Sequence, residues 1–358
     1  MEFGLNFFPA VDPEAKSAAQ YFDETLDLGA EADRLGFTHA RIVEHYFHPY
    51  GGYSPNPLIY LAALAQRTKR MRLITGALLP VFNNPLKMAG EIAMVDALSH
   101  GRLDVGVARA FVPHEFRRFG VSLHESVVRF REGLEQLDLL LTQSNATYAG
   151  RFHSFEDTTS LPRPTQQPRP KFYIAATTTP DSFEFAGRSG HALMANPINA
   201  SIRSFLDLYR DAWRKAGHPG DGEVMMAFHV YCEPDSEAAR KTAKSHLDGY
   251  LAKLLDSAND WGSMKSADYV GYEKMVEKLR GESMETQIAS DAAWIGSPAD
   301  IRASMDRAFE KYGPYEHASL QVNFGMMPYD KALASMRLFA AEVMPHYSAA
   351  RTGVASPA

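Results

Sequence analysis

A glutamate and two histidines lie within five positions of this sequence, in the stretch ARIVEHYFHPYGG. Glu44 and His45 close a short apolar run, and His48 follows three residues later. Histidine and carboxylate side chains can bind zinc or iron, but the spacing is irregular and no third ligand is evident, so we expect no metal. A single histidine can act as an acid or base near neutral pH, and we predict that role for His45. We interpret His48, like His114, as an exposed loop histidine.

A second polar stretch, TTTPDS at positions 177–182, stands where a predicted strand gives way to a helix that begins at Pro180. Its hydroxyl groups and the free N–H groups of a helix start suit a phosphate, and Arg109 at the end of another strand could add a bidentate contact. Residues of these types also commonly do no more than cap a helix, and Asp181 disfavours an anion. From the residues alone both interpretations stay open.

One glycine, Gly76, interrupts the apolar run MRLITGALLP. Glycine weakens a strand because it contributes no side chain to packing, and inside a strand it usually marks a bulge or a close approach to the backbone. A packing adjustment and a molecule bound against the strand would account for it equally well.

These residues follow strands in a chain whose patterns alternate between strand and helix. Short apolar runs precede segments with apolar residues at three- and four-residue spacing, which is typical of helices packed on one face. The alternation predicts parallel strands joined by crossover helices, in eight units. The predicted strands are 2–9, 39–45, 71–80, 102–110, 171–178, 191–196, 223–232 and 317–324.

Eight strand–helix units in a chain of this length favour an α/β fold of the (β/α)8 TIM-barrel type, as a single domain over 1–347. The alternative is an open doubly wound sheet, but the G-x-G-x-x-G turn that usually accompanies that fold is absent. In a barrel the chemistry lies at the carboxyl ends of the strands, where the polar residues above fall. Between 259 and 285 the pattern weakens, which predicts a mobile insertion before the last units. Residues 348–358 are predicted to be a disordered tail.

Composition and charge exclude several classes of function. Hydrophobic residues make up 45% and charged residues 22% of the 358 residues, as in ordinary globular proteins. The net charge of −6 offers no basic field for nucleic acid, and a single cysteine, Cys232, allows no internal disulfide. The first residues lack the basic start of a signal peptide, and no apolar run approaches the ~18 residues of a membrane helix. We therefore expect a cytoplasmic enzyme with no nucleic-acid or membrane partner.

The sequence resembles the bacterial luciferase-like, flavin-dependent monooxygenases, of the luciferase α-subunit type that includes non-luminous members. The resemblance covers residues 2–347 and is weakest over 259–284. Its most specific block is a strand that ends in arginine, followed by an aromatic residue and then by E-F-x-x-F-G. The stretches that carry it are GFTHARIVEHYFHPYGGYSPNPL, MRLITGALLPVFNNPLKMAGEIAMVDALSHGRLDVGVARAFVPHEFRRFGV and KALASMRLFAAEVMP.

This resemblance implies a (β/α)8 barrel that binds reduced FMN at the carboxyl ends of its strands. It puts His45 near the reactive edge of the flavin ring, Glu44 in support at the strand end, and Arg109 at the phosphate. It also implies a bulge with a non-proline cis peptide behind the ring in the third strand, which would explain Gly76. Besides the catalytic His45, the flavin-binding residues that it implies are Thr75, Gly76, Ala77, Arg109, Thr178, Thr179 and Ser182.

Several positions depart from the luciferase pattern. Ala108 stands where luciferase has a cysteine beside the flavin, and Thr178 stands where it has a glutamate. Val127 replaces an arginine that often follows the serine of the HES motif, and Asn196-Pro197 replaces an aromatic residue. Because these substitutions change the surroundings of the ring, we predict no luminescence.

The favoured hypothesis is a two-component monooxygenase. A separate NAD(P)H:flavin reductase would supply reduced FMN, which would form a C4a-peroxide adduct with O2 and transfer one oxygen atom to a small organic substrate. The family pairs its barrels through the helices after strands two and three, so we expect a homodimer. Four aromatic residues could wall the substrate pocket, although core packing explains each equally well: Phe7, Phe8, Phe111 and Phe228.

Two other hypotheses stay open. An enzyme of the same superfamily could transfer hydride with the deazaflavin F420 and use no oxygen, although HEFRRFG resembles the FMN branch more closely. A non-catalytic flavin-binding relative would have lost parts of the barrel. All eight units are predicted here, and both His45 and Arg109 are present.

Overall fold

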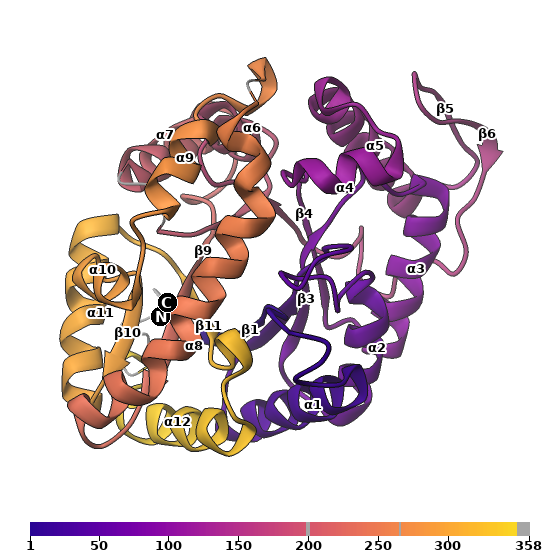
Figure 1. The fold of residues 1–358 in the computed structure, drawn as a ribbon. Coiled ribbons are helices and arrows are strands. Elements are labelled where there is room, and N and C mark those ends of the chain that lie inside the picture. Colours follow the sequence, from indigo (N-terminus) through magenta and orange to yellow (C-terminus); the bar gives the residue numbers. More distant parts are fainter. Residues whose placement is uncertain (198–200, 265, 349–358) are drawn as a thin grey trace.

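The computed structural model describes residues 1–197, 201–264 and 266–348, and its strands form a closed parallel barrel (Figure 1). Eight strands complete the ring, and the last of them pairs back to the first. The predicted (β/α)8 barrel is therefore confirmed, and each of the eight predicted strands is present. In ring order the strands are β1 (Glu2–Phe7), β2 (His39–Ile42), β3 (Arg72–Leu78), β4 (Leu103–Val107), β7 (Phe172–Ala175), β8 (Ala192–Ala195), β9 (Val224–Cys232) and β11 (His317–Gln321).

A further strand, β10 (Ala293–Gly296), lies outside this ring. It pairs with the second half of β9, beyond the residues where β8 pairs with the first half. This strand of four buried residues is not among the predicted ones. A separate antiparallel hairpin is formed by β5 (Ala146–Ala149) and β6 (Ser154–Thr158).

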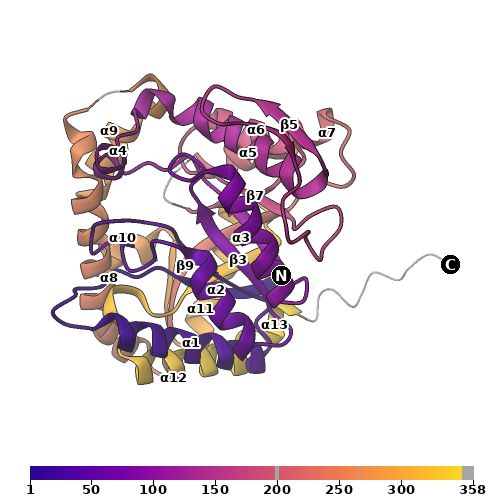
Figure 2. The ribbon, with the colours of Figure 1, turned by 90° about the vertical axis from the view of Figure 1, so that its right-hand side faces the viewer.

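Helices surround the barrel, and α1 and α12 lie side by side in both views (Figures 1 and 2). Asparagine caps with a proline at the first turn begin α2 and α3, as favoured helix starts do. The helices are α1 (Ala18–Leu35), α2 (Pro57–Arg67), α3 (Pro85–Leu98), α4 (Pro113–Phe119), α5 (Ser126–Thr142), α6 (Pro180–Arg188), α7 (Ile202–Lys215), α8 (Ser236–Ala258), α9 (Tyr272–Leu279), α10 (Met284–Ala289), α11 (Pro298–Tyr312), α12 (Tyr329–Glu342) and α13 (Pro345–Ser348).

Two apolar clusters hold the barrel together. The larger one fills the layer between strands and helices, and a small one, which includes Ile74, Tyr173 and Met194, fills the inside of the ring. The inner cluster closes the middle of the barrel. A cavity lies above it, at the carboxyl ends of the strands.

Charged residues close the opposite end of the barrel. Glu223 accepts hydrogen bonds from His317 at 2.9 Å, from Lys171 at 2.7 Å and from the hydroxyl of Tyr173. Burial alone would lower the pKa of His317, but the carboxylates of Glu2 and Glu223 outweigh it and raise that pKa to about 9. The amino-terminal end of the ring is therefore a closed ionic network.

The segment 259–285, predicted to be a mobile insertion, folds against the mouth of the barrel. It contains short 3-10 turns at Asn259–Gly262 and Ala267–Tyr269, followed by α9. Trp261 and Tyr269 are almost fully buried, because the aromatic side chains of the segment pack on one another. Whether the segment moves stays a prediction. The predicted tail over 348–358 lies outside the described residues from 349 onward.

Among the helices of the described ranges, none is long and apolar enough to cross a membrane.

Candidate active site

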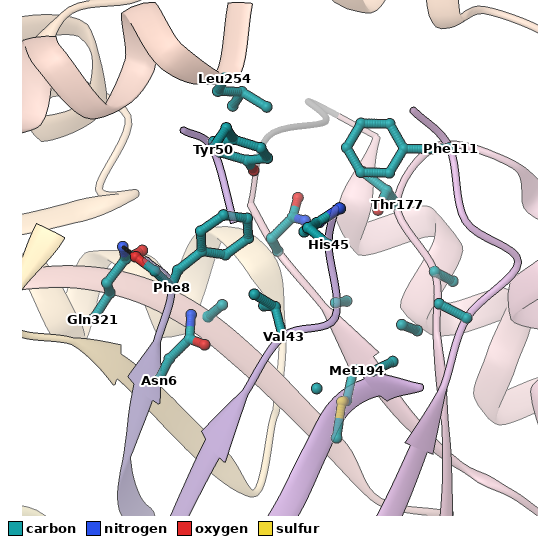
Figure 3. A pocket seen from close by; sticks show the side chains of 18 of the residues that line it. Asn6, Phe8, Val43, His45, Tyr50, Phe111, Thr177, Met194, Leu254 and Gln321 are labelled. Atoms are coloured by element: carbon teal, nitrogen blue, oxygen red, sulfur yellow. Dashed lines mark hydrogen bonds between the residues drawn. The ribbon is translucent and has the colours of Figure 1, made fainter. Parts of the chain in front are cut away.

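A cavity of about 240 Å³ opens at the carboxyl ends of the barrel strands (Figure 3). Most of the residues predicted from the sequence meet there: His45, Gly76, Ala77, Arg109, Thr179 and Ser182 all line it. Thr75 and Thr178 do not line it. The Thr75 hydroxyl donates to the carbonyl of Gly106 at 2.8 Å, which ties β3 to β4.

His45 is held by a buried carboxylate that the sequence analysis does not single out. Its Nδ1 lies 3.0 Å from Oε1 of Glu115, which also accepts the backbone N–H of Tyr46 at 2.8 Å. Glu115 lies on α4 and is 1% exposed, and its Oε2 has no hydrogen-bond partner in the part of the chain that the structure describes. Because a carboxylate only accepts hydrogen bonds, Nδ1 carries the proton, and Nε2 is left to act on a ligand.

Glu44 supports the same loop from the end of β2. Its Oε2 accepts the backbone N–H of Leu79 at 3.1 Å, and its Oε1 accepts the Asn83 amide at 2.9 Å and the hydroxyl of Tyr46. Burial raises the pKa of Glu44 to about 7, against the effect of these hydrogen bonds. Its bonds run to the loop after β3, so Glu44 positions that loop relative to His45.

The third strand carries the predicted bulge. The register between β3 and β4 shifts between Thr75 and Leu78, and the peptide bond Gly76–Ala77 is cis. Both predictions that follow from the resemblance are confirmed here. A Cβ atom at Gly76 would lie 3.0 Å from Cδ of Arg41, so the glycine also leaves room for that side chain.

The start of α6 carries two buried threonine hydroxyls. Thr179 occupies the N-cap position, but its side chain makes no capping hydrogen bond. Among the described residues, the Oγ1 atoms of Thr178 and Thr179 have no hydrogen-bond partner at normal distance, and the hydroxyl of Tyr272 faces that of Thr178. Asp181 turns away to Arg131, at 2.9 Å, so its charge is paired outside the cavity. The helix-cap interpretation therefore does not account for these hydroxyls.

Arg109 faces the same helix start. Its guanidinium lies 4.2 Å above the ring of Tyr269, from the segment predicted to be an insertion. The hydroxyl of Tyr269 donates to the carbonyl of Ala110 at 2.9 Å, and Trp261 donates to that of Phe111 at 2.7 Å. Within the described parts of the chain, Arg109 forms no ion pair with a carboxylate. Its charge is therefore held in place and left free for an anion.

Aromatic side chains wall the cavity around His45 (Figure 3). The ring of Phe8 lies 5.4 Å from that of His45, and the rings of Tyr50 and Phe111 lie at 5.6 Å and 5.9 Å. Phe228 also lines the cavity. Phe7 does not: it packs against Tyr60 outside the barrel, because successive strand residues face opposite sides.

The interpretation of His48 and His114 as exposed loop histidines is wrong. Nε2 of His48 lies 3.0 Å from Asp256 on α8, and its ring lies 5.5 Å from that of His114. His114 is 8% exposed, and burial lowers its pKa. His48 is covered by its contact with α8, and His114 lies on α4 against the ring of His48; no local sequence pattern reports either contact.

Fold and cavity together define a TIM-barrel enzyme with its site at the carboxyl ends of the strands. The family model for luciferase-like monooxygenases matches residues 1–316. The chain therefore belongs to the luciferase-like monooxygenase family, and the predicted family and the predicted monooxygenase activity class are confirmed.

Three similar proteins illustrate the range of this family. The crystal structure of monooxygenase RslO1 from Streptomyces bottropensis is 41% identical, covers 97% of this chain and 100% of that one, and has a TM-score of 0.84. The oxygenase component of flavin-dependent trigonelline monooxygenase from Acinetobacter baylyi is 28% identical over 97% of this chain and 96% of that protein. F420-dependent glucose-6-phosphate dehydrogenase from Amycolatopsis mediterranei is 26% identical over 85% of this chain and 89% of that protein.

Proposed function

We propose that the protein is the oxygenase component of a two-component monooxygenase, which uses reduced FMN and O2 to oxygenate a small organic substrate. One observation carries the proposal. A single cavity joins an arginine and free hydroxyls at a helix start to a histidine held by a buried carboxylate.

The residues at the start of α6 fit the phosphate of FMN. In the described ranges, Arg109 has no carboxylate partner and the hydroxyl of Thr179 has no hydrogen-bond partner. Buried polar groups are almost always hydrogen-bonded, so these atoms favour a bound oxyanion. Arg109, Thr179 and Ser182 would hold the phosphate, and the ring would lie against Gly76-Ala77.

His45 would handle the proton of the reaction. When bound, reduced FMN supplies the two electrons that activate O2, so that one oxygen atom enters the substrate and the other leaves as water. Glu115 fixes the orientation of the His45 ring and stabilises its charged form, so Nε2 can give or accept a proton inside the cavity. The aromatic walls exclude water, which would otherwise divert the oxygen chemistry.

A separate reductase is the expected protein partner. The similarity to the Acinetobacter baylyi protein, which is named as an oxygenase component, supports supply of reduced FMN by a NAD(P)H:flavin reductase. The predicted cytoplasmic location stays a prediction.

An exposed apolar face supports a homodimer. Ile59 on α2 is 71% exposed and Met94 on α3 is 57% exposed, and Leu86 and Leu98 on α3 are exposed as well. The two helices pack against each other, so their apolar residues can form one surface. Large exposed apolar surfaces mark contact sites, and we propose that a second copy of the chain covers this one.

Anaerobic titration with reduced FMN tests the cofactor. The protein should bind reduced FMN, and exposure of the complex to O2 should consume oxygen. Protein that binds reduced FMN no better than bovine serum albumin would contradict the proposal.

The second candidate is a hydride-transferring enzyme that uses F420. The similarity to an F420-dependent dehydrogenase supports it, because that protein matches most of this chain. Titration with F420 in parallel separates the two candidates. Tight F420 binding with weak FMN binding and no oxygen consumption would favour the dehydrogenase.

A further inference from the structure

Arg41 on β2 is a buried cation in the floor of the same cavity. Its side chain is 8% exposed and lines the cavity from inside the barrel. Its Nε donates to the hydroxyl of Ser319 at 2.9 Å, and one terminal nitrogen lies 4.0 Å from the sulfur of Met194, a weak acceptor. Most of its five N–H donors are therefore not used by strong acceptors.

No carboxylate balances the charge of Arg41. It forms no ion pair with an aspartate or glutamate in the described part of the chain, and the titratable groups that interact with it include the Tyr250 hydroxyl and the buried imidazole of His39. Burial lowers the pKa of Arg41 to about 10, so the guanidinium stays charged at neutral pH. Buried charges are as a rule paired, because an unpaired one is costly to remove from water.

Other polar atoms in the cavity floor also lack partners. Asn6 stands beside Arg41 in the register of β1 and β2, so both side chains face the inside of the barrel. Oδ1 of Asn6 and Nε2 of His229 are buried and have no hydrogen-bond partner among the described residues, and both residues line the cavity. Burial lowers the pKa of His229 to about 4, so it is neutral and Arg41 is the cation among these three.

The bulge in β3 brings Arg41 to the place where the flavin ring would lie. A Cβ atom at Gly76 would be 3.2 Å from a terminal nitrogen of Arg41. The guanidinium therefore lies against the bulge from the inside of the barrel. A ring resting on Gly76-Ala77 would meet it along the edge that points inward.

We infer that Arg41 is the cation of a second anion site, in the floor of the cavity, which binds a delocalised anionic edge of the bound small molecule. The inference rests on the proposed function, because reduced flavin carries such a charge along its N1–C2=O edge. A planar guanidinium donates two parallel hydrogen bonds to an edge of this shape. A carboxylate or phenolate of a substrate has the same chemistry, but the contact with Gly76 favours the flavin.

Arg41→Met tests the site because it keeps most of the side-chain length and removes the charge. In anaerobic titrations its affinity for reduced FMN should fall by about tenfold or more, and its affinity for oxidised FMN should change much less. Bound FMN should therefore become harder to reduce, which a potentiometric titration measures. Arg41→Lys keeps the charge without the planar guanidinium, so its affinity for reduced FMN should lie between those of the wild type and Arg41→Met. Arg240→Met, the same change at an exposed position of α8, should match the wild type.

Benzoate and its neutral analogue benzamide test the substrate as the source of the anion. If Arg41→Met loses binding of benzoate but not of benzamide, and FMN affinities are unchanged, the anion site stands and a substrate occupies it. If Arg41→Met changes the affinities for charged and neutral ligands by the same factor, the inference is overturned. Wild-type protein that binds FMN in neither redox state contradicts the proposed function instead, and the benzoate titrations still report on Arg41.

Thermal unfolding of the ligand-free protein separates binding from structural support. Removing an unpaired buried charge should leave the unfolding temperature of Arg41→Met equal to or above that of the wild type. If the unfolding temperature falls and the affinities for reduced and oxidised FMN fall equally, Arg41 is a structural residue and the inference is overturned.

Discussion

His45 and His48 stand three residues apart, but each is held by a carboxylate from a different helix. Glu115 on α4 holds His45, and Asp256 on α8 holds His48, both at 3.0 Å. The side chain of Glu115 is 1% exposed, whereas that of Asp256 is 77% exposed. A charge-assisted hydrogen bond is stronger in the dry environment, so only the His45 pair is suited to stabilise charge during a reaction.

Glu115→Gln should impair the oxygen chemistry and leave flavin binding intact. It keeps an acceptor for Nδ1 of His45 but removes the charge that stabilises the charged ring. The complex with reduced FMN reacts with O2 to give the final products, and we expect the rate of this reaction to fall by about tenfold to a hundredfold. Stopped-flow absorbance measures that rate, and Asp256→Asn serves as the matched control. Equal behaviour of the two variants would contradict the role given to Glu115.

Single residues differ in how far the sequence predicts them. His45 and Arg109 could be found because each follows the end of a strand, where a barrel places its chemistry, and Gly76 because a glycine inside an apolar strand is unusual. Glu115 lies 70 positions beyond His45, and its contact exists only once α4 has folded over the mouth. Arg41 reads as an ordinary strand residue, and only its burial without a carboxylate partner distinguishes it.

At the scale of elements, α2 and α3 present apolar residues to solvent while their other faces build the core. Met94→Glu should therefore convert a homodimer into a monomer. A charge buried without a partner in an interface costs about 3 kcal/mol or more. Size-exclusion chromatography with light scattering should give about twice 39.8 kDa for the wild type and 39.8 kDa for the variant.

Val270→Glu provides the control, because Val270 is 68% exposed in the segment over the barrel mouth and away from these helices. It should remain a dimer. If light scattering gives the mass of a monomer for the wild-type protein, the proposed homodimer is wrong.

The elements that the sequence does not predict are short or lack a repeating pattern. The eight ring strands could be predicted because strand-like and helix-like patterns alternate along the chain. In the segment 259–285 an apolar stripe is confined to α9, whose buried side chains lie at helical spacing: Tyr272, Met275, Val276 and Leu279. The part before α9 is ordered by aromatic contacts such as that of Trp261 with Tyr269. Tyr269 in turn orients Arg109, so this segment contributes to the site despite its weak pattern.

At the scale of the whole molecule, the barrel has one open end and one closed end. The closed end depends on His317, which lies between Glu2 and Glu223 and has a pKa raised to about 9. A histidine with a raised pKa stabilises the folded protein fully below the unfolded value near 6.5. That stabilisation is lost as the pH rises through about 9.

His317→Asn should remove this part of the pH dependence. Between pH 6.5 and 9 the free energy of unfolding of the wild type should fall by about 1–3 kcal/mol more than that of the variant. Urea unfolding at a series of pH values measures the difference. His346→Asn, at an exposed position, should follow the wild type. Parallel curves for wild type and His317→Asn would contradict the ionic role of the network.

We expect the mouth of the barrel to bind reduced FMN and to direct its reaction with O2. Stopped-flow absorbance, recorded after the anaerobic complex of protein and reduced FMN is mixed with oxygenated buffer, tests this expectation. Reduced FMN should disappear in a first phase, and oxidised FMN should appear only in a later, slower phase. If oxidised FMN appears in a single phase, at the rate of free reduced FMN, the protein does not direct the reaction.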